Sequence, residues 1–262
     1  MNLDLSGFYA LVTGGSTGMG YEMAKALASH GATVAAVARA GKKLDKAAQR
    51  FKDEGFGDIS VLEMDVRSDA SVNKVAKWVE ENWGRIDMLV NNAGIGMGAV
   101  NKDFTAPPLP SYEVPVDVFC DMVSTNFIGH FLTSRAFLPM MLKQKSGRIV
   151  NVTTGLATLT AQGQMPYGPA KAGMEAMSTI MGEELKDQGI MINVVLPGGA
   201  TDTGLIPEGS REMFVKRGNL QTPDILNETI LFFASPKADG IYNQRVLGRE
   251  FHQWLEEKGI TL

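Results

Sequence analysis

Several features that would assign this 262-residue chain to a special class of protein are absent from its sequence. It has one cysteine, Cys120, so no internal disulfide can form and the chain suits a reducing compartment. No apolar run approaches the roughly 20 residues of a membrane span. The N-terminal MNLDLSGFYA has no basic region followed by an apolar stretch, as a secretory signal would. We therefore expect a cytoplasmic protein without a membrane segment.

Charge of one sign and metal-ligand spacing are also lacking. The 25 Lys and Arg residues nearly balance 29 Asp and Glu residues, which leaves a net charge of −4. Proteins that bind nucleic acid usually carry a basic face, so we expect no nucleic-acid partner. His30, His130 and His252 are scattered along the chain, so we expect no metal.

What the sequence does contain is an alternation of short apolar runs with helical periods. The runs predict buried strands, and the periods between them predict helices. The predicted strands are 8–13, 32–38, 59–66, 86–91, 148–153 and 191–197, and the helices are 18–30, 41–54, 68–83, 115–143 and 166–187. This alternation favours an α/β fold, a doubly wound parallel sheet of Rossmann type, in one domain over 1–262. Ligands of such sheets bind beyond the carboxyl ends of the strands.

Two segments interrupt the alternation. Residues 95–114 and 198–222 carry Gly and Pro and are too long for tight connections. Loops longer than about 12–15 residues are usually functional or disordered. Both segments leave the ligand edge of the sheet, so we expect them to be walls or lids. Their Met and Phe residues suggest a partly hydrophobic substrate.

A glycine-rich turn follows the first predicted strand. The sequence TGGSTGMG, Thr13 to Gly20, leads directly into a helix. Glycines allow a sharp turn and a close approach of the backbone, while the helix offers free N–H groups to an anion. A second match, GIGMGA at 94–99, runs into Pro107 and Pro108 instead of a helix, so we discard it.

The end of the second predicted strand bears on the choice of nucleotide. A site for NAD places an acidic residue about 20 positions after the turn. Here the sequence is VARAGKK, with Ala38 and Arg39, followed by Lys42 and Lys43. Because Arg39 can bind a 2′-phosphate with a forked, charged hydrogen bond, we expect NADP(H) to be preferred over NAD(H).

These motifs, in this order, resemble the classical short-chain dehydrogenase/reductase family. The resemblance covers about residues 5–235 and rests on TGGSTGMG, Asp65-Val66, NNAG at 91–94, Asn126, Tyr167 with Lys171, and Pro197-Gly198. It implies catalytic roles for Asn126, Thr154, Tyr167 and Lys171. It also implies cofactor contacts from Gly14, Ser16, Thr17, Gly18, Met19, Gly20, Arg39, Asp65, Val66, Asn92, Ala93, Gly94, Tyr167, Lys171, Pro197, Gly198 and Thr201, with Thr203 as the alternative to Thr201.

The resemblance leaves one catalytic position altered. The family's serine precedes its tyrosine by the interval that separates Thr154 from Tyr167, so a threonine stands in its place. Thr153 is the alternative, but strand alternation points it to the other side. A threonine hydroxyl can donate and accept hydrogen bonds as serine does. We expect Thr154 to stabilise the substrate oxygen and Lys171, one helical turn after Tyr167, to lower the pKa of the phenol. The resemblance adds that Asn126 anchors a water and that Lys171 holds the nicotinamide ribose.

The chain departs from the family at two further places. The 95–114 segment is longer than usual, and the ending YNQRVLGREFHQWLEEKGITL replaces the usual Gly-Gly. We expect a short helix there, with Trp254 and Leu255 packed inward. The resemblance implies a homo-oligomer, dimer or tetramer, that uses helices 115–143 and 166–187.

The sequence therefore predicts an NADP(H)-dependent oxidoreductase that interconverts a secondary alcohol and its ketone, with Tyr167 as general acid/base. A nucleotide-sensing regulatory protein on the same fold is the alternative, although a sensor does not need the Tyr–Lys pair. An epimerase that uses the cofactor transiently is a third possibility.

Overall fold

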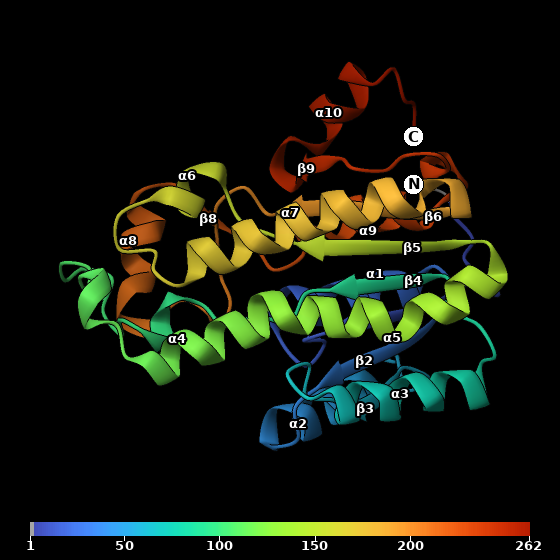
Figure 1. The fold of residues 1–262 in the computed structure, drawn as a ribbon, viewed down its shortest axis with the longest axis horizontal. Helices are drawn as coiled ribbons and strands as arrows, with labels where there is room; N and C mark the ends of the chain where they lie inside the picture. Colours follow the sequence, from blue (N-terminus) through green and yellow to red (C-terminus); the bar gives the residue numbers. More distant parts are fainter. Residues whose placement is uncertain (1–2) are drawn as a thin grey trace.

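A computed structural model describes residues 3–262 of the chain. Its centre is a seven-stranded parallel sheet in the order β3-β2-β1-β4-β5-β6-β9 (Figure 1). The strands are β1 (Tyr9–Thr13), β2 (Thr33–Ala38), β3 (Ser60–Glu63), β4 (Met88–Asn91), β5 (Gly147–Val152), β6 (Ile190–Leu196) and β9 (Arg245–Leu247). The predicted doubly wound fold is thus confirmed.

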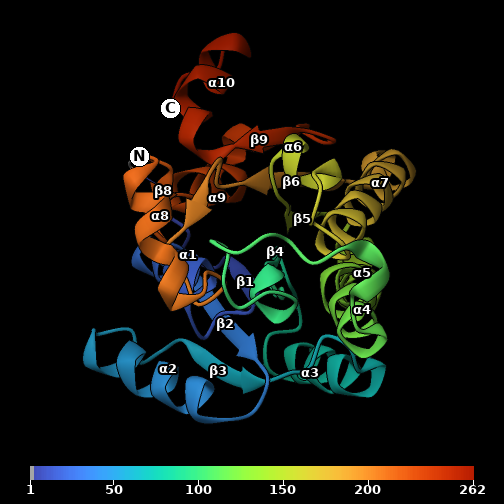
Figure 2. The ribbon, with the colours of Figure 1, turned by 90° about the vertical axis from the view of Figure 1, so that its left-hand side faces the viewer.

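Ten α-helices are found among the described residues. They are α1 (Gly18–Ser29), α2 (Lys42–Asp53), α3 (Asp69–Asn82), α4 (Val116–Val123), α5 (Gly129–Gln144), α6 (Leu156–Thr160), α7 (Tyr167–Leu185), α8 (Arg211–Lys216), α9 (Asn227–Ala234) and α10 (Phe251–Glu257). In Figure 2 the sheet stands between two layers, with α1 and α9 on one face and α3, α5 and α7 on the other. None of these helices is long and apolar enough to cross a membrane.

Alternation along each strand divides the core between the two faces. Val12 and Val150 pack on the α1 and α9 side, whereas Leu11 and Ile149 pack on the α3 and α5 side. All four side chains are fully or almost fully buried. Because the strands are apolar on both faces, they can lie only inside a three-layer arrangement.

A polar layer in the core fixes α5 and α7 against the sheet. Asn91 on β4 donates to the Asn151 side chain on β5 at 2.8 Å and to Ser134 Oγ on α5 at 3.1 Å. Asn151 in turn donates to Ser178 Oγ on α7 at 2.8 Å. Buried amides and hydroxyls that satisfy one another specify one arrangement of the elements that carry them.

The structure adds elements that the sequence analysis did not predict. Strand β9 extends the sheet beyond β6, and a short parallel pair, β7 (Ala200–Thr201) and β8 (Leu220–Gln221), lies inside the 198–222 segment. The predicted helix 115–143 is divided by a π-helical turn at Ser124–Ile128. These elements have too few residues to show a clear period. The C-terminal prediction is confirmed, since α10 buries Leu255 and packs Trp254 against the core.

Candidate active site

A large cavity lies at the carboxyl ends of the strands, where doubly wound sheets bind ligands. Its volume is about 1340 Å³, which exceeds the roughly 300–1,000 Å³ of a typical small-ligand pocket. We call the cavity residues within 14–19, 38–43, 64–67 and 92–94 the nucleotide wall. The cavity residues within 95–114 and 198–222 form the substrate wall. A cavity of this size can hold a dinucleotide and a second molecule.

The glycine turn is shaped for close approach. Gly14 and Gly18 have φ values of +65° and +56°, which L-side chains rarely adopt. A Cβ at Gly15 would meet the Ala36 Cβ at 2.8 Å. Helix α1 begins at Gly18 with no side-chain cap and no acidic residue in its first turn, so its N–H groups face the cavity free to bind phosphate. The turn therefore fits a dinucleotide.

Hydrogen bonds fasten this turn to the end of β4. Thr13 Oγ1 accepts from the backbone N–H groups of Asn92 and Ala93, both at 2.9 Å. The Asn92 side chain donates back to the Thr13 carbonyl at 2.9 Å. The glycine turn and NNAG thus form one rigid corner at the switch point between β1 and β4.

The predicted cofactor residues line the cavity with one exception. Gly20 does not face it, because this glycine lies under the turn, where a Cβ would meet the Gly14 carbonyl oxygen at 2.4 Å. Arg39 is exposed at the cavity after β2, with Lys42 and Lys43 beginning α2 beside it. No acidic side chain stands at the end of β2.

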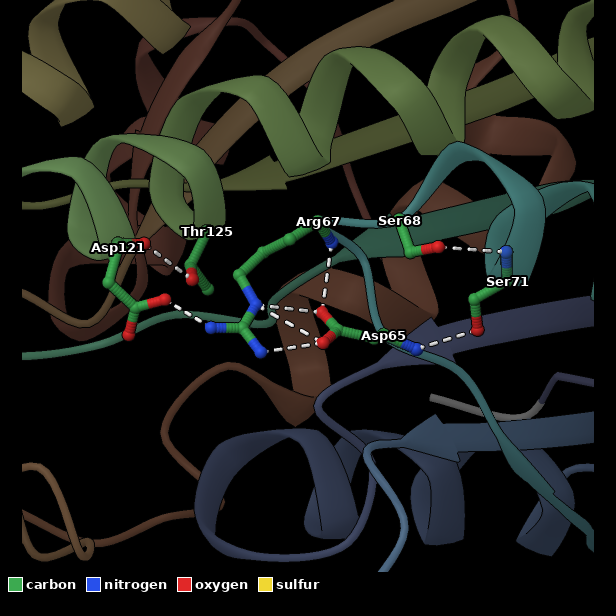
Figure 3. Close-up of polar contacts among 6 residues, drawn as sticks. All are labelled: Asp65, Arg67, Ser68, Ser71, Asp121 and Thr125. Atoms are coloured by element: carbon green, nitrogen blue, oxygen red, sulfur yellow. Dashed lines mark hydrogen bonds and ion pairs between the residues drawn. The ribbon is translucent and has the colours of Figure 1, made fainter.

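The part of the nucleotide wall that follows β3 contains an ion-pair cluster that sequence analysis did not find (Figure 3). Arg67 donates to both oxygens of Asp65, from Nε at 2.9 Å and from Nη2 at 2.6 Å. Its Nη1 donates to Asp121 on α4. The hydrogen bonds from Arg67 are the largest cause that lowers the pKa of Asp65, and Arg39 contributes less. Asp65 is therefore anionic, and its carboxylate is already paired with Arg67. A ligand at this place would contact the ion pair and not a free carboxylate.

Ser68 and Ser71 hold this cluster in place. Ser68 caps α3 by accepting from the Ser71 N–H at 3.2 Å. The Ser71 hydroxyl accepts from the Asp65 N–H at 3.0 Å. In Figure 3, Asp65 and Arg67 lie between the start of α3 and helix α4.

Thr154 and Tyr167 lie together at the cavity. Burial raises the pKa of the Tyr167 phenol, and the neighbouring Thr154 hydroxyl lowers it by a smaller amount. Thr153 also lines the cavity, but its hydroxyl is already engaged, because it donates to Glu175 at 2.5 Å. The structure therefore brings together the residue pair that the family interval indicates.

Lys171 lies one turn after Tyr167 and is only 4% exposed. Its Nζ donates to the Val152 carbonyl at 2.7 Å. Burial lowers its pKa to about 8, and Glu175 opposes this shift. The causes that act on the Tyr167 pKa are burial and Thr154, so the predicted lowering by Lys171 is not found for this arrangement. The Lys171 ammonium is instead held by the backbone carbonyl of Val152.

Asn126 occupies the π-helical turn and does not line the cavity. Its Oδ1 accepts from the Ile95 N–H at 2.7 Å and its Nδ2 donates to the Ile95 carbonyl at 2.8 Å. The side chain is fully buried and committed to the start of the 95–114 segment. A role in anchoring water would thus belong to backbone groups of the turn, because its amide is already engaged.

His130 lies one turn after Asn126 and is also buried. Its Nε2 contacts the Ala93 carbonyl at 3.2 Å, while its Nδ1 has no hydrogen-bond partner. Burial, with a smaller contribution from Lys171, lowers its pKa to about 3. This histidine stays neutral at physiological pH. Within residues 3–262, no group of three or more His, Cys, Asp or Glu side chains could hold a metal ion.

Pro197 and Gly198 line the cavity beyond β6, as predicted. Thr201 is buried and its hydroxyl has no partner, whereas the Thr203 methyl would lie 2.8 Å from a Cβ at Gly18. Both threonines line the cavity, so the choice between them stays open. Arg249, not predicted from sequence, packs its Cγ and Cδ against Gly198.

The two segments of the substrate wall hold each other. The Phe104 N–H donates to Ser210 Oγ at 2.9 Å, and the Phe104 and Phe214 rings meet edge to face at 6.3 Å. A Cβ at Gly96 would meet Leu205 at 2.6 Å. In Figure 2 the 95–114 segment crosses in front of the sheet edge toward α8. The two segments predicted to be walls or lids thus contact each other at the cavity.

Comparisons with known proteins agree with this geometry. A family model described as short chain dehydrogenase matches residues 9–212. The crystal structure of a short-chain type dehydrogenase/reductase from Mycobacterium marinum superposes with a TM-score of 0.81 at 27% identity and covers 95% of this chain and 96% of that one.

Curated relatives point to the same kind of chemistry. The chain is 32% identical to the 3-oxoacyl-(acyl-carrier-protein) reductase FabG of Vibrio cholerae, over 90% of this chain and 93% of that protein. It is 33% identical to BbsD of Thauera aromatica, a dehydrogenase subunit named for a substituted succinyl-CoA, over 90% and 92% of the two chains.

Proposed function

The chain belongs to the short-chain dehydrogenase family of oxidoreductases, and from this premise we propose that it is an NADP(H)-dependent enzyme that interconverts a secondary alcohol and its ketone. The observation that carries the proposal is the meeting of the Thr154 hydroxyl and the Tyr167 phenol at the cavity, with Lys171 buried beneath them. A protein that only sensed nucleotide would have no need of this acid–base set.

The reaction requires hydride at carbon and a proton at oxygen. A bound reduced nicotinamide would supply the hydride. The Tyr167 hydroxyl gives its proton to the carbonyl oxygen, and Thr154 donates a hydrogen bond to the same oxygen as negative charge develops there. Lys171 does not act on the phenol's pKa in the arrangement described, so we propose that its positive charge stabilises the phenolate only once the ligands are bound.

The protonation states of Tyr167 and Lys171 at neutral pH favour reduction of a ketone. Burial raises the pKa of Tyr167, so the phenol holds its proton at neutral pH and is ready to give it away. Lys171, with a pKa near 8, is mostly charged at pH 7. Both groups are therefore in the state that a ketone reductase needs before each turnover.

The preference for NADP(H) rests on the charges at the end of β2. Arg39 is exposed at the cavity and has no acidic neighbour on β2, while Asp65 is neutralised by Arg67. A ribose 2′-phosphate would thus meet a cation and no free carboxylate. Relatives named as FabG reductases fit a reductive role.

The substrate class follows from the substrate wall. Met97, Phe104, Leu109, Met213 and Phe214 give this wall an apolar lining. A partly hydrophobic ketone suits this wall, and the named relatives include a 3-oxoacyl-(acyl-carrier-protein) reductase and a dehydrogenase subunit for a substituted succinyl-CoA.

Assembly and cellular location belong to the same proposal. Phe131 on α5 and Ile180 on α7 are 44% and 59% exposed, which favours a homo-oligomer through these helices. The exposed thiol of Cys120 suits the reducing cytoplasm.

The test is NADPH oxidation over a panel of apolar ketones, compared between the wild type and Tyr167→Phe. We expect wild-type turnover, and a loss of about 10²–10⁴-fold in kcat for the variant, since it keeps the ring and removes only the proton. NADPH binding, followed by fluorescence titration, changes far less than kcat, because the aromatic ring remains. Tight binding with no turnover of any ketone or alcohol by the wild type contradicts the proposal and favours the sensor.

A further inference from the structure

Two charged residues that the proposed mechanism does not use meet beside Thr154. Glu175 lies one turn after Lys171 on α7, and Arg245 is the first residue of β9. Arg245 Nε donates to Glu175 Oε2 at 3.0 Å, and its Nη2 donates to the Thr154 carbonyl at 2.5 Å. Both side chains are mostly shielded, with 27% and 17% exposure for Arg245 and Glu175.

Arg245 reaches Thr154 across an intervening strand. Strand β9 pairs with β6, and β6 pairs with β5, so the arginine starts two strands, or about 10 Å, away. Strand β5 ends at Val152, so the Thr154 carbonyl lies past the ladder and needs another donor. The guanidinium supplies it.

Three separate contacts fix the backbone just before the catalytic hydroxyl. The Thr153 N–H donates to the Val195 carbonyl at 2.8 Å. The Thr153 hydroxyl donates to Glu175, and the Thr154 carbonyl accepts from Arg245. Of the polar groups in this dipeptide, the Thr154 hydroxyl is the one that acts on the pKa of Tyr167.

We propose that Arg245 and Glu175 form a positioning pair that holds the Thr153–Thr154 backbone so that the Thr154 hydroxyl faces Tyr167. Because threonine is β-branched, its hydroxyl direction is set by a small number of χ1 wells relative to the backbone. A backbone that rotates turns the hydroxyl with it. Arg245 lines the cavity, but its guanidinium is engaged by Glu175 and the Thr154 carbonyl, so we assign it a positioning role. The role proposed for the pair rests on the proposed function of Thr154.

Arginine is required for this task because its planar fork can serve the carboxylate and the carbonyl together. A lysine keeps the charge near Glu175, but all of its N–H donors lie on one nitrogen, so it cannot span both partners as the guanidinium does. Arg245→Lys therefore separates the positioning role from the charge. The pair also makes β9 a part of the site, although β9 lies at the edge of the sheet.

A matched control exists at the opposite end of β5. Arg148 also joins a carboxylate to backbone carbonyls, with Nη2 donating to Asp239 at 2.5 Å and Nη1 to Phe233 and Ser235 at 2.6 and 2.5 Å. It does not line the cavity. Arg148→Lys therefore loses contacts of the same kind without touching Thr154.

The test is a double-mutant cycle on kcat with NADPH and a ketone substrate. Misplacement of a catalytic group costs up to about 10²-fold, so we expect Arg245→Lys to lose about 10-fold or more in kcat. Its NADPH affinity stays unchanged, and Arg148→Lys keeps its kcat. In a Thr154→Ala background Arg245→Lys adds no further loss, because the group that it positions is gone. Glu175→Gln, which keeps the size of the side chain, loses activity in the same direction.

Additive losses from Arg245→Lys and Thr154→Ala, or equal kcat values for Arg245→Lys and Arg148→Lys, overturn the positioning role. Full activity of Thr154→Ala, or no turnover by the wild type, contradicts the proposed function instead. A second measurement needs no cofactor: amide hydrogen exchange of residues 153–158 is faster in Arg245→Lys and unchanged in Arg148→Lys. Unchanged exchange in both variants also overturns the pair.

Discussion

The two walls of the cavity are built in different ways. Every segment of the nucleotide wall follows a strand of the sheet, and hydrogen bonds such as those of Thr13 to NNAG join one strand end to the next. The substrate wall consists of two long segments that hold mainly each other, through Phe104, Ser210 and Phe214. A wall fixed by the sheet recognises a constant ligand, whereas a wall of loops can vary without changing the fold. Thr154 and Tyr167, the proposed catalytic residues, line the same cavity between the two.

Among changes to the two walls, the largest effect is expected from adding one methyl group under the nucleotide wall. A Cβ at Gly20 would lie 2.4 Å from the Gly14 carbonyl oxygen and 2.5 Å from Asn92 Nδ2, so the turn must shift. We expect Gly20→Ala to weaken NADPH binding by about 100-fold, in line with the cost of overpacking. Fluorescence titration measures this, with Gly57→Ala as the control, because the nearest atom to a Cβ there is 3.9 Å away. Equal affinities for the two variants would show that the turn is not rigid.

Lys171, which lines the cavity between the two walls, predicts a pH dependence of the activity. Burial lowers the pKa of Lys171 to about 8, so its charge is present at neutral pH and is lost as pH rises through that value. We expect kcat/KM for ketone reduction to be level below pH 8 and to fall by about tenfold per unit above it. His130 stays neutral over this range and contributes nothing. A profile that stays level to pH 10 contradicts the assigned role of Lys171.

Substitutions at the end of β2 test whether the nucleotide wall selects NADPH over NADH. Replacing Ala38 by Asp together with Arg39→Ala removes the cation and adds a carboxylate that would repel a 2′-phosphate. We expect the ratio of kcat/KM for NADPH to that for NADH to fall by about 10-fold or more, since charged hydrogen bonds contribute about 1.5–3 kcal/mol. A wild type that already prefers NADH would show that Arg39 does not select the cofactor.

The smallest effect is expected in the substrate wall. Phe214→Ala removes the ring that meets Phe104, and we expect a change of a few-fold in KM for the ketone. The affinity for NADPH stays the same, because the nucleotide wall is fixed by the sheet. Kinetics with a short and a long ketone measure the change. A large loss of NADPH binding would mean that the two walls are coupled.

The parts that sequence analysis predicted are those where periodicity or a fixed interval carries the information. Six strands and the helices between them follow from apolar patterns, and Thr154 follows from its interval to Tyr167. The strand β9 escaped because RVL is short and flanked by polar residues. The π-helical turn at Asn126 escaped because an inserted residue leaves no mark in composition.

Contacts between distant segments could not be predicted from one sequence. Arg67 lies two residues after Asp65, so its ion pair was within reach of sequence reasoning, but its link to Asp121 depends on how α4 packs. The contact of Arg245 with Thr154 joins residues 91 positions apart. For Lys171, burial proved a stronger influence on the pKa than any neighbouring charge. Such effects follow from three-dimensional packing, which motif spacing does not record.

The most direct test of the central claim is the kcat for ketone reduction by NADPH in the wild type, Thr154→Ser and Thr154→Ala. If the Thr154 hydroxyl stabilises the substrate oxygen beside Tyr167, serine keeps kcat within about tenfold while alanine loses about 10²-fold or more. An alanine variant as active as the wild type would place the essential hydroxyl elsewhere and contradict the account.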